Sequence, residues 1–195
     1  MGHIFYLMGK SSTGKDTLYK KLLRDPRLNL QRLVTYTTRP IRVGEKEGKE
    51  YHFVDENAYE RMKNCNQIIE SRVYHTYHGD WIYYTAQDEH IDTTQNDYII
   101  IGTLEAYVKV RDFYGEGVVV PILITLNDGE RLYRAYNRER KQKEPKYEEL
   151  CRRFLADSVD FSEEKIAAAG ITKSFENKIL FDCYEEIKRY IISFI

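Results

Sequence analysis

The sequence predicts an α/β fold in which helices flank a parallel sheet. Short apolar runs of strand length alternate with segments of helical periodicity along most of the 195 residues, which is the order typical of parallel strands joined by right-handed crossovers. The first apolar run also leads through a glycine-bounded loop directly into a helical segment, the local arrangement of a phosphate-binding loop, or P-loop. Both observations fit a chain of one domain.

The first predicted strand covers residues 4–8, and the loop after it reads G-K-S-S-T-G-K before a helix predicted over 16–23. The glycines let successive N–H groups point inward at phosphate oxygens, and the helix N-terminus adds its positive end. Lys15 supplies a mobile charge for the β- and γ-phosphates, and Asp16 stands where the usual loop has Ser or Thr. The predicted nucleotide-binding residues are Gly9, Lys10, Ser11, Ser12, Thr13, Gly14, Lys15, Asp16 and Thr17.

Residues 36–90 are predicted to form a small, mostly β insertion, because they lack the long helical periods found elsewhere. Asp55 is a good N-cap for the short helix expected there, which ends near residue 61. Strand-like runs in or next to this insertion lie at residues 32–35, 51–54, 68–74 and 79–85.

The alternation of strands and helices resumes after the insertion. Residues 98–102 form a continuous apolar run, the pattern of a central parallel strand. Asp128 is expected to cap a charged helix that Pro145 ends, and Gly170 to end the helix after it. The remaining elements are predicted as helices over 104–113, 128–141, 147–169 and 180–195 and strands over 118–125 and 171–175.

Composition limits the partners of the chain. Its 30 basic and 31 acidic residues give a formal net charge of −1, which predicts no nucleic-acid or membrane partner and leaves anionic ligands to local clusters of Arg and Lys. The three cysteines are odd in number and widely spaced, which predicts free thiols in a reducing compartment, the cytoplasm. The first apolar run is too short for a signal peptide, and no stretch is long enough to span a bilayer.

A second cluster of anion-binding side chains follows the first helix. Arg39 and Arg42 offer guanidinium groups that bind phosphate through paired hydrogen bonds, and Thr35 and Tyr51 offer hydroxyl groups. An anion site separate from the P-loop indicates two phosphorylated ligands that face each other. Taken alone, the cluster also fits a solvated basic turn.

At this cluster the chain resembles a known family. T-Y-T-T-R-P-I-R-V-G-E at 35–45, followed by G-K-E-Y-H-F-V at 48–54, is similar to the GMP-binding region of the guanylate kinase family. The resemblance implies that Arg39, Arg42 and Tyr51 hold the GMP phosphate, with Thr35 in the hydroxyl position.

The resemblance continues at the residues that would read the base. I-I-E at 68–70 looks like the family's F-[IL]-E, whose glutamate recognises guanine, which makes Glu70 the expected reader. One carboxylate accepts from guanine N1–H and N2–H₂ together, whereas adenine presents an acceptor at N1. In the aromatic turn at 79–85, similar to the family's N-Y-Y-G-[ST], Tyr83 is matched to the phosphate and Thr85 to the base.

The chain departs from the family at the strand over 99–106. The family has I-L-D-[IV]-D-x-Q-G there, and both aspartates are missing. Ile101 stands for the aspartate linked to the metal, and Thr103 for the one that helps bind guanine. Another (deoxy)nucleotide or a phosphorylated metabolite therefore remains an alternative acceptor.

The charged helix resembles the family's lid. Arg131, Arg134 and Arg138 are spaced three and four apart and share one face, and Arg153 follows on the next helix. Alone they fit a solvated helix with Glu partners, whereas the resemblance makes Arg134, Arg138 and Arg153 the residues that close over the phosphates. F-E-N at 175–177 is similar to the segment that places an asparagine near adenine, here Asn177.

Together these motifs indicate a divergent, bacterial-type nucleoside-monophosphate kinase that converts ATP and GMP to ADP and GDP. The catalytic residues are expected to be Lys15, Arg39, Arg134, Arg138 and Arg153. Mg²⁺ is expected with ATP, and Asp16 and Thr17 are its expected ligands in place of the aspartate lost at Ile101; the alternative is that Asp16 only caps the helix.

The resemblance also implies a division of the chain and its partners. A single domain over 1–195 is expected to have a core of residues 1–35, 91–134 and 154–195, a monophosphate-binding subdomain at 36–90 and a lid at 135–153. ATP and GMP are the expected partners, with the chain a monomer or homodimer. A non-catalytic binding module is the alternative from another class, but Lys15 and the loop glycines are kept, which favours an enzyme.

Overall fold

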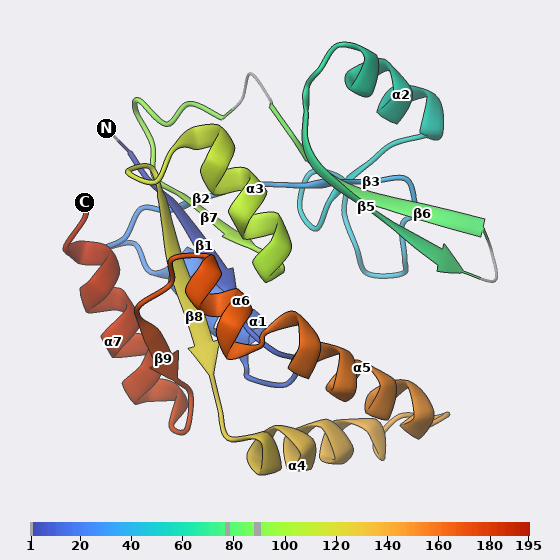
Figure 1. The fold of residues 1–195 in the computed structure, drawn as a ribbon, viewed down its shortest axis with the longest axis vertical. Helices are drawn as coiled ribbons and strands as arrows, with labels where there is room; N and C mark the ends of the chain where they lie inside the picture. Colours follow the sequence, from blue (N-terminus) through green and yellow to red (C-terminus); the bar gives the residue numbers. More distant parts are fainter. Residues whose placement is uncertain (1, 77–78, 88–90) are drawn as a thin grey trace.

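The computed structural model describes residues 2–76, 79–87 and 91–195. Within them the larger sheet has five parallel strands in the order β2-β7-β1-β8-β9, and helices cover both of its faces (Figure 1). This confirms the predicted α/β class. The strands are β1 Ile4–Met8, β2 Gln31–Arg32, β7 Tyr98–Ile101, β8 Val119–Thr125 and β9 Ser174–Glu176.

The two faces of the sheet form two hydrophobic clusters, because successive side chains of a strand point to opposite sides. Tyr6 packs with Tyr107 and Val110 of helix α3 (Leu104–Tyr114), on the face that also carries α6 (Glu163–Ala168). Leu7 lies in the other cluster, with α1 (Lys15–Arg24) and α7 (Leu180–Ile192). Every residue of β1 is buried, so the loop that follows it leaves the centre of the sheet.

A second sheet of four strands has the order β4-β3-β6-β5 and lies at one end of the molecule (Figure 1). Its strands are β3 Tyr36–Thr37, β4 His52–Phe53, β5 Ile68–Thr76 and β6 Gly79–Ala86. Helix α2 (Glu56–Asn64) packs on it through Tyr59, whose ring meets the ring of Tyr84 edge-on. Asp55 caps this helix by accepting a hydrogen bond from the Ala58 amide at 2.7 Å, as predicted.

Two helix predictions are wrong. The single helix expected over 147–169 is two helices, α5 (Tyr147–Asp160) and α6, because Phe161 turns into the core and Ser162 caps the second helix. Helix α4 (Asp128–Glu139) begins at Asp128, but its cap is the Asn127 side chain, which accepts from the Gly129 amide at 2.9 Å.

Helices α4 and α5 lie together beyond the carboxyl end of β8 (Figure 1). Gly170 follows α6 with a φ of 71°, the left-handed conformation expected of a C-terminal glycine. No helix in the described part of the chain is long and apolar enough to cross a membrane.

Candidate active site

Residues 9–17, which comprise the loop between β1 and α1 and the first turn of α1, are called the donor loop below. Gly14 is the N-cap of α1, has a φ of 87°, and makes no side-chain cap. A Cβ at this position would lie 2.3 Å from Nδ2 of Asn177, and that amide donates to the carbonyl of Thr13 at 2.7 Å. Glycine is therefore required here, and the first amides of α1 keep the free N–H groups that bind anions.

The donor loop also holds one strained residue. Ser12 has a φ of 63°, the left-handed region that non-glycine residues rarely adopt. Its Oγ is buried and has no hydrogen-bond partner among the described residues. Buried hydroxyls are normally paired, so this loop has an unused polar group of the kind that a phosphate oxygen satisfies.

A buried ion pair fixes the other end of the loop to helices α4 and α5. Arg131 of α4 is 1% exposed and donates to Asp157 of α5 at 2.8 Å, to the Ser11 carbonyl at 3.0 Å and to Asp128. Asp157 in turn accepts from the backbone amide of Ser11 at 2.7 Å. Sequence reasoning missed Asp157, because 146 residues separate it from its partner in the loop.

Lys15 lies among the predicted lid arginines. Burial lowers the pKa of its ammonium group, Asp16 and Asp157 oppose this, and Arg153 and Arg138 add to it. Both arginines line a cavity of about 180 Å³ together with Ser11 and Ser12 of the donor loop. Three cationic side chains therefore converge on the loop, as a site for a polyanion requires, with Asp16 and Asp157 as their acidic neighbours.

Arg134 and Asn177 meet at the other side of the loop. The Arg134 guanidinium donates to the Asn177 carbonyl at 3.0 Å, and Asn177 Oδ1 is buried without a hydrogen-bond partner among the described residues. Both lie against Gly14. The structure thus brings the two predicted residues together at the start of α1.

A cavity of about 550 Å³, called the acceptor cavity, lies between the second sheet and the larger sheet. Six of the predicted acceptor residues line it: Thr35, Arg42, Tyr51, Glu70, Tyr83 and Thr85. Arg152 and Arg153 of α5 also line it. Arg153 therefore borders both this cavity and the smaller one at the donor loop.

Arg39 lies behind this cavity and not in its lining. It is 4% exposed, forms a bidentate pair with Glu45 at 2.7 and 2.6 Å, and donates to the Tyr83 hydroxyl at 3.0 Å. The hydrogen bonds from Arg39 lower the pKa of Glu45 from 4.5 to about 2. Glu45 is the last residue of the motif at 35–45, but the sequence does not reveal that its carboxylate binds the Arg39 guanidinium.

Glu70 is 4% exposed on β5, and each of its carboxylate oxygens has one partner. Thr85 donates to one at 2.8 Å, and Arg72 Nε donates to the other at 3.2 Å. Arg72 also donates to Thr103 at 3.1 Å, and Thr103 caps α3 rather than lining the acceptor cavity. Sequence reasoning missed Arg72. The available signal was its spacing, because a residue two positions after Glu70 on the same strand lies on the same face of the sheet.

Asp16 is exposed in the first turn of α1. The helix has no side-chain cap, so the alternative that Asp16 caps it is wrong. Asp16 lines a cavity of about 390 Å³ with Thr35, Tyr51 and Ile101, and thus shares a cavity with the position that lacks the family's aspartate. Thr17 is exposed beside it.

The residues at this cavity fit Mg²⁺ that is bound together with a nucleotide, and not Mg²⁺ held by protein groups alone. The described part of the chain has no group of three or more His, Cys, Asp or Glu that would hold a metal by itself. Mg²⁺ bound with nucleotides instead uses one or two carboxylates, with substrate phosphates and water completing the shell. A single exposed carboxylate within the donor loop, Asp16, suits that mode.

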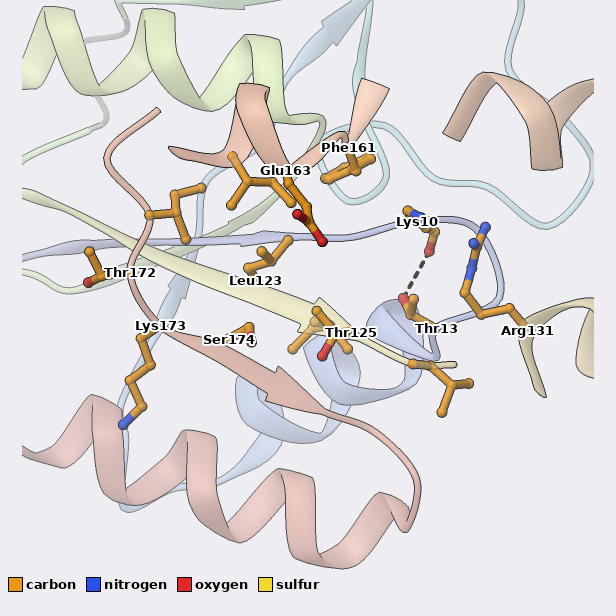
Figure 2. A pocket seen from close by; sticks show the side chains of 14 residues that line it. Lys10, Thr13, Leu123, Thr125, Arg131, Phe161, Glu163, Thr172, Lys173 and Ser174 are labelled. Atoms are coloured by element: carbon orange, nitrogen blue, oxygen red, sulfur yellow. Dashed lines mark hydrogen bonds between the residues drawn. The ribbon is translucent and has the colours of Figure 1, made fainter. Parts of the chain in front are cut away.

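A further cavity of about 380 Å³ lies on the α6 face of the larger sheet (Figure 2). Lys10 and Thr13 of the donor loop reach it, and Thr13 donates to the Lys10 carbonyl at 2.9 Å. Leu123 and Thr125 of β8 and Glu163 of α6 line the rest (Figure 2). None of the predicted acceptor residues lines this cavity.

Comparison with known proteins shows the family. The family model described as guanylate kinase matches residues 2–101. Guanylate kinases of Porphyromonas gingivalis and Caldanaerobacter subterraneus subsp. tengcongensis are 25% and 27% identical, over 100% and 96% of this chain and 99% and 95% of their own lengths. The guanylate kinase of Anaplasma phagocytophilum is 40% identical over 80 residues, which is 40% of this chain and 38% of that relative.

The fold agrees with these relatives. A crystal structure of guanylate kinase from Anaplasma phagocytophilum superposes with a TM-score of 0.67 at 21% identity, over 98% of this chain and 85% of that one. The family model covers more than half of the sequence, including the donor loop, the two arginines at 39 and 42, and Glu70. The chain belongs to the guanylate kinase family.

Proposed function

We propose that this chain transfers the terminal phosphoryl group of ATP to GMP, giving ADP and GDP. One observation carries the proposal: Arg153 borders the cavity at the donor loop and also the acceptor cavity that contains Glu70. A guanidinium between two phosphate sites is placed to neutralise the group that passes from one to the other.

ATP would bind along the donor loop. The loop amides and Lys15 would hold its β- and γ-phosphates, and the unpaired Ser12 hydroxyl and Asn177 Oδ1 are polar groups available to it. Arg134 lies against Asn177, on the side where the base and sugar of ATP would leave the loop. Roles for Thr13 and Thr17 at the phosphates stay predictions.

GMP would bind in the acceptor cavity. Arg42, Tyr51 and Tyr83 line the part suited to the phosphate, and Glu70 and Thr85 the part suited to guanine. Arg39 supports this site from behind in the present structure, through Glu45 and Tyr83. Its direct contact with phosphate remains a prediction and requires the guanidinium to exchange Glu45 for the substrate.

The reaction needs charge neutralisation more than proton transfer. A GMP phosphate is already an anionic nucleophile, so no general base has to act on it. The transferring phosphoryl group spreads negative charge over its oxygens, and preorganised cations lower the barrier. Lys15, Arg138 and Arg153 would do this, because the two arginines already lie close enough to Lys15 to add to the lowering of its pKa that burial causes.

Mg²⁺ would accompany ATP, with Asp16 and Thr17 as the protein groups nearest to it. When bound, the ion would neutralise phosphate charge. Replacing Asp16 by Ala is expected to raise the Mg²⁺ concentration needed for half-maximal activity, and an unchanged Mg²⁺ dependence would remove Asp16 from this role.

The proposed division of labour follows the two sheets. Residues 36–90 would form the GMP-binding subdomain and residues 135–153 the lid, on a core of the remaining segments.

The three cysteines, Cys65, Cys151 and Cys183, are free in the structure, in keeping with the predicted cytoplasmic location. A measurement of molecular mass in solution would decide between a monomer and a homodimer.

A coupled ADP-release assay over a panel of nucleoside monophosphates with MgATP tests the proposal. Turnover confined to GMP and dGMP is the expected result. Turnover with a different acceptor would keep the chemistry and change the substrate. No turnover with any acceptor, while GMP still binds, would make the chain a binding module.

A further inference from the structure

The acceptor cavity is lined by a further charged group, Arg72, that the proposed function has not used. Arg72 follows Glu70 by two positions on β5 and lines the same cavity. Its Nε donates to Glu70 at 3.2 Å and its Nη1 to Thr103 at 3.1 Å. These two contacts fix the plane of the guanidinium. Its Nη2 has no hydrogen-bond partner within the described residues.

Glu70 keeps capacity for a ligand despite its two partners. A carboxylate has about four lone-pair sites, and Thr85 and Arg72 use one on each oxygen. Each oxygen therefore has one site left, which suits two adjacent donors. Guanine offers such a pair in N1–H and N2–H₂.

The next atom along that edge of guanine is the O6 acceptor. When the base is oriented with N1–H on Glu70 Oε2, the oxygen that accepts from Arg72, its O6 lies on the side of the Arg72 guanidinium. Arg72 Nε is 3.2 Å from that carboxylate oxygen. Arginine is the side chain that most often donates to O6 and N7 of guanine in specific recognition, since its planar fork matches the two acceptors. Adenine carries an amino group at the same position, which is a donor facing a donor.

On the basis of the proposed function, we propose that Arg72 is a specificity-determining residue that donates to O6 of the acceptor guanine. Glu70 reads the two donors of the base and Arg72 reads its acceptor. The pair covers the whole hydrogen-bonding edge without the aspartate that Thr103 replaces. Thr103 instead holds the guanidinium in place.

The test compares three acceptors in wild type and Arg72→Ala by kcat/KM. GMP has all three groups. 6-Thio-GMP keeps both donors but has a weak sulfur acceptor in place of O6, and IMP keeps O6 and N1–H but lacks the N2 amine. We expect wild type to prefer GMP over 6-thio-GMP by about tenfold, the value of one good hydrogen bond to a charged group. This ratio should fall toward about one in Arg72→Ala, while the GMP-to-IMP ratio stays at the wild-type value.

Two controls separate reading the base from supporting Glu70. If Arg72 only positions Glu70, its loss lowers the GMP-to-IMP ratio as well, and that result overturns the proposal, as does an unchanged GMP-to-6-thio-GMP ratio. Arg152→Ala removes another arginine that lines the cavity and should leave both ratios unchanged.

Folding does not obscure the outcome, because each ratio is measured within one variant. If Arg72→Ala is inactive, Arg72→Lys keeps a positive charge beside Glu70 but loses the planar fork, and the same two ratios decide. Competition binding of GMP and 6-thio-GMP replaces kcat/KM if neither variant turns over. A wild-type chain that fails to phosphorylate GMP would overturn the proposed function, whereas normal GMP turnover with unchanged ratios would overturn only the role of Arg72.

Discussion

Asp157 of α5 links the donor loop to Arg131 of α4, and its removal gives a sharp prediction. Its Oδ2 accepts from the Ser11 amide at 2.7 Å and from Arg131 at 2.8 Å, and its Oδ1 accepts from the Ser11 hydroxyl at 3.3 Å. Arg131 is buried. Asp157→Ala therefore removes three hydrogen bonds and half of the charge that neutralises a buried guanidinium.

The size of the effect follows from what remains around Arg131. Removing one partner of a buried ion pair costs about 3–5 kcal/mol. Asp128 and the Ser11 carbonyl still accept from Arg131. We therefore expect the free energy of unfolding to fall by the lower end of this range, about 3 kcal/mol. A chain of this size loses about 2–4 °C in Tm per kcal/mol, so we expect a drop of about 6–12 °C.

Asp157→Asn separates charge from hydrogen bonding. Its amide oxygen takes the place of Oδ2 and keeps the acceptor for Ser11 and Arg131, so the expected loss is smaller, about 1 kcal/mol. Asp160→Ala removes an exposed carboxylate one turn further along the same helix. This control should stay within about 0.5 kcal/mol of wild type.

The functional readout is steady-state kinetics with each substrate varied in turn. Because Ser11 belongs to the donor loop, Asp157→Ala should raise the KM for ATP at a temperature where the variant is folded, and leave the KM for GMP near the wild-type value. A Tm within about 2 °C of wild type would refute the energetic reasoning, since a drop of at least about 6 °C is expected. Equal rises in both KM values would refute the link to the donor loop.

Three further predictions rest on single side chains. Lys15→Met should lower kcat by about 10²–10³-fold, the usual cost of one preorganised charge, with an unchanged circular dichroism spectrum; a near-normal kcat would exclude Lys15 from the transfer step. Gly14→Ala forces a Cβ to 2.3 Å from Asn177 at a left-handed φ and should abolish binding of an ATP analogue in calorimetry, whereas retained affinity would show that the loop tolerates a side chain. Arg39 lowers the pKa of Glu45 from 4.5 to about 2. The free energy of unfolding in urea should therefore be higher for wild type than for Glu45→Gln, with the full difference above pH 4.5 and a shrinking one as the pH falls toward 2. A pH-independent difference would contradict the ion pair.

Much of the core could be predicted because its signals are local. The apolar runs of β1, β7 and β8 are buried on both faces of a parallel sheet, and such strands are continuous in their hydrophobicity. The glycine-bounded loop and the Asp55 cap likewise depend on neighbours within a few residues. The α/β class and the position of the donor loop follow from these features alone.

The errors lie where distant residues or close competitors decide. Helical periodicity runs on from α5 into α6, and the break between them exists because Phe161 packs into the cluster formed by the sheet and α3. The preference for aspartate at a helix N-cap favoured Asp128, but Asn127 precedes it by one position and caps instead. Periodicity cannot reveal a break that is set by tertiary packing, and capping preferences do not choose between two adjacent good caps.

The candidate site shows the same contrast. Motif spacing located Arg42, Tyr51 and Glu70, which line one cavity, but it treated Arg39 as a free guanidinium. In the structure the Arg39 guanidinium donates to the carboxylate of Glu45, six residues later. A sequence motif thus identifies which side chains gather at a site, whereas their partners in the absence of ligand depend on the folded loop.

The two departures from the family motif at β7 have a common structural explanation. At Ile101 the missing carboxylate has a neighbour in Asp16, since both line one cavity. At Thr103 the remaining hydroxyl accepts from Arg72, whose guanidinium also reaches Glu70. A charged group from another element is thus associated with each position: Asp16 of α1 lines the same cavity as Ile101, and Arg72 of β5 donates to Thr103. The end of β7 carries neither of the family's aspartates, whereas the cavities around it are lined by Asp16, Glu70 and Arg72. We therefore expect the metal and base contacts of this kinase to come from these other positions.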